Sequence, residues 1–508
     1  MSLINAYIIE KSPFRIAMSD FLIKINNTIN RTVWGIPALT LLIGTGVLLT
    51  LFTKGFQFTH FGYVMKYIFK SIRPGRRQPH DPHSISQFQA LCTALSGTIG
   101  TGNISGIAYA ITVGGPGAIF WMWIAALVGM ITGFAEKVLG IYFRKRNKEG
   151  EWCGGPMYYL KYGLGSKRGC QKLGCILAAL FALFTVFASF GIGNLSQLVS
   201  IRESVLSLTS FTGNARADAF VIGVCIAILA SVVTLGGLKR IARVNEALVP
   251  FMACFYIVGT IVIISTHADQ ILPAIVSIFQ HAFSMEAAAG GVGGTIMKHA
   301  ITCGFKRGVF SNEAGLGSSV IVHATSDVKE PVLQGFWGIF EVFVDTIVMC
   351  TLTALLILTS GAVDLKTGIS QITGSGFALA TESFTASFGI WGGMFMTIAI
   401  TLFAIATVFG WNYYGVKAWE YLFGTGSSMI YKYIYIAVIL LGCTLNVDLI
   451  IDLSDTFNGL MAIPNLIGIL SLTGTLTNIL DNYKRRCFQG ETALKPVLSY
   501  FQDTATDK

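Results

Sequence analysis

Two glycine-rich runs carry the residues of this sequence that are best suited to bind a ligand. The first, 96–106, reads Ser-Gly-Thr-Ile-Gly-Thr-Gly-Asn-Ile-Ser-Gly, and the second, 290–295, reads Gly-Gly-Val-Gly-Gly-Thr. Each lies within an apolar stretch, where glycines can interrupt a membrane helix. At an interruption, free amides point at an anion and free carbonyls coordinate a cation. This non-covalent chemistry suits a zwitterion bound together with a small cation such as sodium.

The simpler interpretation of these glycines is that they only let helices pack closely. Backbone can be left unpaired in lipid only where another group meets it. We favour two interrupted helices because the two runs occupy corresponding places in the chain, and because threonine and asparagine alternate with glycine in the first.

Polar side chains in other apolar stretches are also expected to face the interior of the protein and not the lipid. Asn194 and Gln197 are three residues apart, and Thr407 and Trp411 are four apart, so each pair shares a helix face. An amide or hydroxyl at membrane depth must face inward. Two alternatives remain open. The amides could only form hydrogen bonds between helices, and the tryptophan could be an anchor at the membrane interface.

Two acids, Glu341 and Asp345, lie one helical turn apart in an apolar stretch that contains no basic residue. They are candidates for binding a proton or another cation. A structural role as neutral, hydrogen-bonded acids is equally compatible with the sequence. For Lys298, which lies in the stretch that contains the second glycine run, the sequence suggests no role.

Composition identifies the elements that must position these residues. Of the 508 residues, 53% are hydrophobic and 12% are charged, and the mean hydropathy is +0.64. Soluble domains carry about 25% charged residues, so a soluble protein is excluded. The sequence predicts an all-α polytopic membrane protein embedded in a lipid bilayer.

About eleven segments are long enough to cross a hydrocarbon core. They are 34–53, 86–111, 117–143, 172–200, 218–237, 244–266, 286–305, 332–359, 389–412, 430–447 and 457–479. With this count every strongly basic loop falls on one side; these loops include Lys66–Arg77, Arg144–Lys148, Lys239–Arg243, Lys306–Arg307 and Lys484–Arg486. That side is predicted to be cytoplasmic, with the N-terminus outside and the C-terminus inside.

Setting the first span aside leaves ten spans in two groups of five, each beginning with a glycine-interrupted helix. This predicts a 5+5 inverted repeat within one transporter domain, 1–508. Its parts are an extra N-terminal helix (34–53), a first repeat (86–266), a second repeat (286–479) and a cytoplasmic tail (480–508).

Other function classes are disfavoured. The net charge of +10 comes from basic residues in loops between apolar spans, which is a topology signal and not a nucleic-acid surface. Seven histidines form no metal-protease spacing, which disfavours an enzyme. Ten scattered cysteines form no C-x-x-C pair and are interpreted as small apolar packing residues. No cofactor is expected.

Four segments resemble the alanine or glycine:cation symporter family. They are Gly100–Ala108, Gly154–Leu160, Phe305–Ser318 and Gly410–Gly415. The resemblance implies a LeuT-like fold and sodium-driven, or sometimes proton-driven, uptake of alanine or glycine across the cell inner membrane. An uncoupled or proton-coupled amino-acid permease is the alternative.

The resemblance also implies roles for individual residues. Main-chain amides at Thr101, Gly102 and Asn103 would hold the substrate carboxylate, and Gln197 and Trp411 would contact its amino group and side chain. Thr407 with the carbonyls of Ser96 and Ile99 would bind sodium. Gly290, Gly291 and Gly294 would face the substrate from the second interrupted helix. We expect Phe305–Ser318 to be a cytoplasmic structural or gating element.

Overall fold

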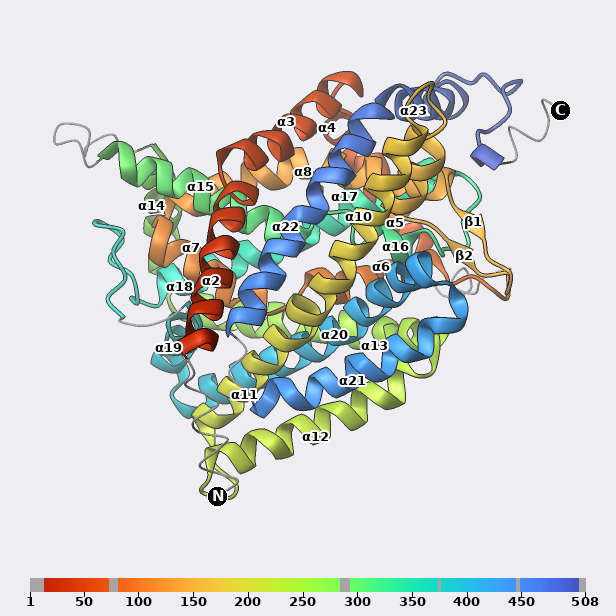
Figure 1. Cartoon of the computed structure of the whole chain (residues 1–508). Helices are drawn as coiled ribbons and strands as arrows, with labels where there is room; N and C mark the ends of the chain where they lie inside the picture. The colour runs from red at the N-terminus through yellow and green to blue at the C-terminus, as the bar shows by residue number, and fades with distance from the viewer. Residues whose placement is uncertain (1–12, 73–80, 284–292, 373–375, 445–447, 502–508) are drawn as a thin grey trace, which may run out of the picture.

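The described chain is built almost entirely of helices. The computed structural model describes residues 13–72, 81–283, 293–372, 376–444 and 448–501 (Figure 1). The longer helices are α2 (Pro13–Val33), α3 (Ile36–Phe52), α5 (Phe61–Ser71), α6 (Gln87–Thr98), α7 (Ser105–Gly114), α8 (Gly117–Tyr142), α10 (Gln171–Phe190), α11 (Ser196–Leu208), α12 (Ala215–Thr234), α13 (Gly237–Thr266), α14 (Ile271–Phe283), α15 (Gly293–Asn312), α17 (Pro331–Val342), α18 (Thr351–Thr359), α19 (Gly376–Phe388), α20 (Ile390–Phe423), α21 (Ser428–Thr444), α22 (Asp448–Ser471) and α23 (Thr473–Phe488).

Short elements complete the description. They are helices α4 (Phe56–Thr59), α9 (Pro156–Tyr158) and α16 (Val320–His323), together with strands β1 (Lys145–Arg146) and β2 (Trp152–Cys153). The two strands form an antiparallel hairpin, with Lys145 opposite Cys153. Helix α14 was not expected, because the sequence predicts a loop over 267–285.

The helices confirm the all-α membrane class but not the count of eleven spans. In the part of the chain that the structure describes, eight helices are long and apolar enough to cross a membrane, or nine if the bent pair α22–α23 is one span. The predicted spans 86–111 and 286–305 are missing from that number. The first is divided between α6 and α7, and the second corresponds to α15, which carries Lys298, Lys306 and Arg307.

The predicted interruption of the second span is confirmed. Helix α6 begins at a capping box, in which the Ser86 hydroxyl accepts from the Gln89 amide and the Gln89 side chain accepts from the Ser86 amide. It ends at Thr98, a short 3-10 turn follows at Thr101–Asn103, and α7 then begins at Ser105. The chain between the two helices is therefore unwound at Gly100.

A second interruption lies after α15, whereas the one predicted at 290–295 falls largely outside the described residues and stays a prediction. Residues Gly293–Thr295 are helical, and 284–292, with Gly290 and Gly291, lie outside the described residues. The described interruption runs over 313–319, between α15 and α16. Its backbone has positive φ at Glu313 (55°), Gly315 (94°) and Gly317 (81°), values incompatible with a continuing right-handed helix.

Helices α8 and α17 make a particularly close contact through glycine. A Cβ atom built on Gly338 of α17 would lie 2.4 Å from the carbonyl oxygen of Gly133 on α8. Only glycine allows backbones to approach this closely, as in membrane helix pairs packed through small residues. This contact fixes two helices that both reach the interruption at 313–319.

We expect Gly338→Ala to destabilise the protein by about 1–3 kcal/mol, because the new methyl group meets backbone that cannot rotate away. The measurement is the thermal unfolding temperature of the purified protein in detergent. Gly44→Ala in α3 is the matched control, since a Cβ there would meet no heavy atom within 4 Å. Equal unfolding temperatures for the two variants would contradict the steric argument.

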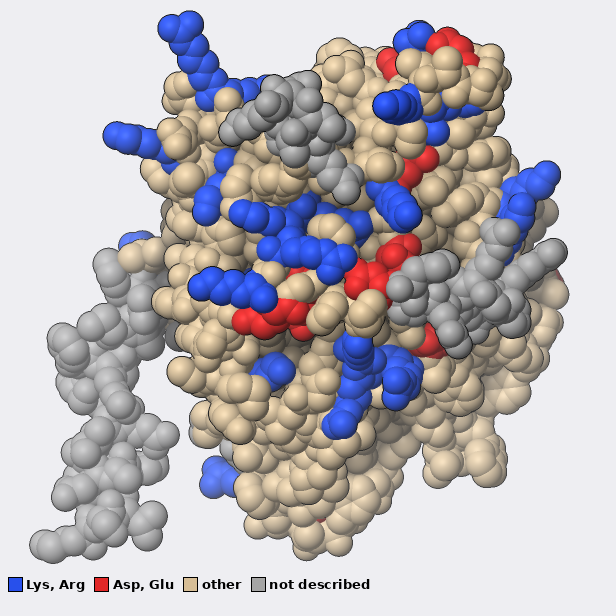
Figure 2. All heavy atoms as spheres, turned by 90° about the vertical axis from the view of Figure 1, so that its right-hand side faces the viewer, with Lys and Arg blue, Asp and Glu red and all other residues tan. Residues whose placement is uncertain are grey.

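Basic side chains gather on the face that carries the hairpin. Figure 2 shows Lys and Arg spread over this face with a few acids between them. Lys145, Arg146 and Lys148 of the hairpin region are exposed. One-sided clustering of basic residues is the pattern from which the sequence predicts the cytoplasmic side.

Candidate functional site

The unwound segment between α6 and α7 leaves backbone groups without helical partners. The Gly100 amide donates to Oδ1 of Asn103 (2.9 Å), in place of the Ser96 carbonyl that would continue the helix. Ile99, at the end of α6, has ψ of 87° and is not helical. The Ser96 carbonyl therefore loses its helical donor and can meet a cation.

An open cavity of about 400 Å³ reaches this segment. Three predicted substrate residues, Thr101, Gly102 and Gln197, line it. The Thr101 hydroxyl donates to Oε1 of Gln197 (3.1 Å), and Nε2 of Gln197 donates to the Ile192 carbonyl (2.9 Å). The structure thus brings the first interruption and the polar face of the fourth predicted span together at one cavity.

The residues predicted to bind sodium also lie near Gly100. A Cβ on Gly100 would lie 2.9 Å from Oγ1 of Thr407 in α20 and 4.0 Å from Oε1 of Gln197. Ser96 packs against the same helix, since a Cβ on Gly410 would lie 2.6 Å from its hydroxyl. Ser96, Ile99 and Thr407 are all buried. Hydroxyl and carbonyl oxygens are the ligands that suit sodium in interrupted helices.

Asn103 does not line the cavity. Its side chain is buried, and Nδ2 donates to Oδ1 of Asp345 (2.7 Å) and to the Ser311 hydroxyl (3.1 Å). Ser311 donates in turn to Oδ2 of Asp345 (2.7 Å). The side chain therefore joins the first interruption to the end of α15, just before the second.

Trp411 lies one turn beyond Thr407 and is fully buried. It packs on the backbone of Gly193, where a Cβ would lie 2.2 Å from the Trp411 Cβ. Its indole Nε1 has no hydrogen-bond partner among the described residues. Of the glycines predicted in the second interruption, Gly294 lies in the first turn of α15, and Gly290 and Gly291 lie outside the described residues.

The segment Phe305–Ser318, predicted to be a cytoplasmic structural or gating element, begins within a helix, and its place relative to the membrane stays a prediction. Residues 305–312 form the end of α15, and Arg307 and Phe310 line the same cavity as Thr101. The Arg307 guanidinium lies 4.3 Å from the ring centre of Tyr109. The cavity also contains Asp455 and Glu203, so its wall carries charges of both signs.

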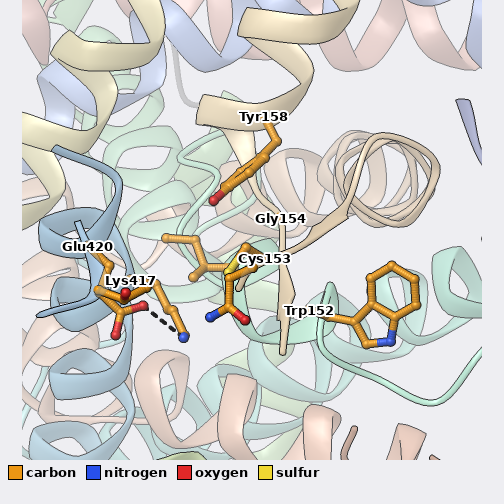
Figure 3. A pocket seen from close by; sticks show the side chains of 9 residues that line it. Trp152, Cys153, Gly154, Tyr158, Lys417 and Glu420 are labelled. Atoms are coloured by element: carbon orange, nitrogen blue, oxygen red, sulfur yellow. Dashed lines mark hydrogen bonds and ion pairs between the residues drawn. The ribbon is translucent and has the colours of Figure 1, made fainter. Parts of the chain in front are cut away.

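The far end of α20 is closed. Lys417, ten residues or about 15 Å beyond Thr407, lies 2.8 Å from both Glu420 and Glu151 of the hairpin loop. Figure 3 shows Lys417 and Glu420 at a small cavity of about 50 Å³ beside Cys153. The described side chains at this end of α20 thus enclose only a small cavity, whereas the cavity beside Thr101 is about 400 Å³.

Further contacts hold the hairpin to the rest of the chain. Arg144 donates to the carbonyls of Ala324 (3.0 Å), Ser326 (2.7 Å) and Val328 (2.5 Å). At Asp81, burial raises the pKa, but hydrogen bonds from the His83 amide, the Ser84 hydroxyl and Arg146 outweigh it and lower the pKa to about 2. The ion pair between Asp81 and Arg146 (2.5 Å) thus persists at neutral pH.

An all-helical membrane bundle in which unwound backbone faces both a cavity and buried oxygen atoms is the architecture of a secondary transporter. The sequence profile of the sodium:alanine symporter family matches residues 19–496. The chain belongs to this family, which is a family of multi-pass membrane transporters.

Individual relatives agree with this assignment. The chain is 43% identical to the sodium/alanine symporter AgcS of Methanococcus maripaludis over 459 residues, which cover 90% of this chain and 96% of AgcS. It is 32% identical to the amino-acid carrier protein AlsT of Bacillus subtilis, covering 89% and 90% of the two chains. Among solved structures, MhsT in complex with L-phenylalanine matches 80% of this chain and 99% of that chain, with 15% identity and a TM-score of 0.47.

Proposed function

We propose that this protein is a secondary active transporter that carries alanine together with sodium by alternating access. The observation that carries the proposal is the position of Gly100. Thr101 and Gln197 face the open cavity beside it, and Thr407 approaches its unwound backbone. A substrate and an ion bound at one unwound segment can stabilise each other, which is all that coupling requires.

The segment suits a small zwitterion. Main-chain amides near Thr101 and Gly102 would hold its carboxylate, and the side-chain oxygen of Gln197 would accept from its amino group. The chain belongs to the sodium:alanine symporter family, and glycine differs from alanine only by the loss of one methyl group. We therefore propose glycine as a second substrate. No cofactor beyond the transported ion is required.

For the ion, sodium fits better than a proton. The proposed ligands are the Thr407 hydroxyl and the carbonyls of Ser96 and Ile99, and none of these groups titrates near neutral pH. Proton coupling is the alternative. From the basic loops we also propose import across the inner membrane, with the N-terminus outside and the C-terminus cytoplasmic.

Uptake into proteoliposomes tests the proposal, with the sodium and pH gradients imposed separately. An inward sodium gradient should drive accumulation of labelled alanine above the external concentration, and unlabelled glycine should compete. A potassium gradient of the same size is the control. Accumulation driven only by the pH gradient would favour proton coupling, and equilibration without accumulation would favour an uncoupled facilitator.

A further inference from the structure

The interruption at 313–319 is held by side chains from two distant helices. The Gly315 amide donates to Oε1 of Glu136 in α8 (3.0 Å), and its carbonyl accepts from Nδ2 of Asn465 in α22 (2.8 Å). Nδ2 of Asn465 also donates to Oε1 of Glu136 (2.7 Å). The peptide groups of Gly315 are thus satisfied by one carboxylate and one amide, as unwound backbone at membrane depth must be.

The other end of the interruption is held by a buried ammonium group. Nζ of Lys137, next to Glu136 in α8, donates to the Ser319 hydroxyl (2.8 Å) and lies 3.0 Å from Oε2 of Glu341 in α17. Nε2 of His323, in the helix that follows the interruption, lies 3.1 Å from the same Glu341 oxygen. The Lys137 and Glu341 side chains are 1% and 0% exposed. We call Glu136, Lys137, Glu341 and Asn465 the clamp.

Stability alone does not account for the clamp. A buried ion pair gives no more stability than a well-packed apolar pair, because both charges lose their hydration. The contacts of Lys137 and Glu136 also fall on the interruption itself, at Ser319 and Gly315. Their geometric effect is to fix the path of the chain from α15 to α16.

That path connects directly to the first interruption. Ser311 lies in the last turn of α15, immediately before the clamped segment, and its hydroxyl accepts from Asn103 (3.1 Å). Asn103 in turn holds the Gly100 amide (2.9 Å). A change in the clamped segment would therefore be transmitted to the backbone at Gly100 through two side-chain contacts.

We propose that Lys137 is a positioning residue for transport, which fixes the conformation of 313–319 and thereby the contact between the two interruptions. The inference that this affects turnover rests on the proposed function. The conformational part does not, because amide hydrogen exchange in 313–319 reports the clamp whatever the protein transports.

Two variants of the full-length protein separate positioning from ordinary ion pairing. Lys137→Met/Glu341→Gln removes the ammonium group and the carboxylate nearest to it, 3.0 Å away, while Glu136, 3.7 Å from Lys137, keeps its hydrogen bonds from Gly315 and Asn465. Ser319→Ala removes only the hydrogen bond from Lys137. Ser383→Ala is the matched control, because Ser383 is equally buried and its hydroxyl donates only to the Leu379 carbonyl within α19.

In both clamp variants we expect amide exchange of a peptide covering 313–319 to accelerate by about tenfold or more. The maximal rate of sodium-driven alanine uptake should fall by about tenfold in the double variant, with KM changed by less than about threefold, because the clamp acts on turnover and not on substrate contact. Ser383→Ala should leave both unchanged.

The positioning role would be overturned if amide exchange of 313–319 in the clamp variants stayed at the wild-type rate. It would also be overturned if exchange became faster while alanine uptake did not fall. If the double variant does not fold, Ser319→Ala decides alone, and wild-type behaviour there overturns the proposal. A wild-type protein that fails to take up alanine, while exchange still responds to the clamp variants, would refute the proposed function and leave the conformational part of the inference supported.

Discussion

Replacing Asn103 with leucine is expected to abolish alanine uptake while folded protein is still produced in reduced amount. The variant loses the acceptor for the Gly100 amide and the donors to Asp345 and Ser311. Hydrogen bonds to charged groups contribute about 1.5–3 kcal/mol each, and a buried group left unpaired costs a similar amount. The unwound backbone at Gly100 would no longer be held in place to bind substrate.

The measurement is the rate of uptake in proteoliposomes, normalised to the amount of protein that elutes as a single species on gel filtration. Asn26→Leu is the control, since Asn26 is also buried and hydrogen-bonded, to Thr456, but lies in α2 away from both interruptions. Uptake by Asn103→Leu at the rate of the control would show that this amide is not needed for the site.

The surroundings of Asn103 show which features of the site could be predicted from the sequence and which could not. The run from Ser96 to Gly106 predicted an interrupted helix because glycine, threonine and asparagine occur together in an apolar stretch. The structure confirms the position of this interruption, because α6 ends at Thr98 and α7 begins at Ser105. The partners of Asn103 were not predictable, because Ser311 and Asp345 lie more than 200 residues away and nothing in the local pattern selects them.

The interruption at 313–319 was not predicted from the sequence, for a physical reason. Glycine density pointed to 290–295, whereas the described interruption begins at Glu313, after a helix that contains Lys306 and Arg307. Lys306 and Arg307 lower the local hydropathy. In the sequence, this part of a helix that lines a polar cavity therefore looks like a cytoplasmic loop. A better signal was the spacing of Gly315 and Gly317, which allows positive φ twice within one turn.

The ion site stays a prediction, but two of its three proposed ligands could be placed from the sequence because Ser96 and Thr407 lie on regular helices. Thr407 and Trp411 share one face of α20, and the structure places that face against the end of α6 and against Gly193. The four-residue spacing could not show that Trp411 is fully buried and does not line the open cavity. That the Trp411 indole contacts the substrate remains a prediction.

The sharpest test of the ion site is Thr407→Val, which keeps the shape of the side chain and removes the hydroxyl beside Gly100. We expect the sodium concentration for half-maximal uptake to rise by about tenfold, equivalent to the loss of about 1.4 kcal/mol of ion binding. Folding should change little, because the hydroxyl otherwise only donates to the Phe403 carbonyl of its own helix (2.9 Å).

Thr185→Val is the matched control for this effect. Thr185 is equally buried, and its hydroxyl donates to the Phe181 carbonyl (2.8 Å), four residues back in α10. The two variants therefore lose the same local hydrogen bond, and only one of them loses an oxygen atom that faces the unwound segment. A sodium dependence changed equally in both would assign the effect to helix perturbation, and an unchanged dependence in Thr407→Val would remove Thr407 from the ion site. A change confined to Thr407→Val would place the cation between α20 and the end of α6, beside Gly100, which Thr407 approaches and which directly precedes Thr101 of the cavity.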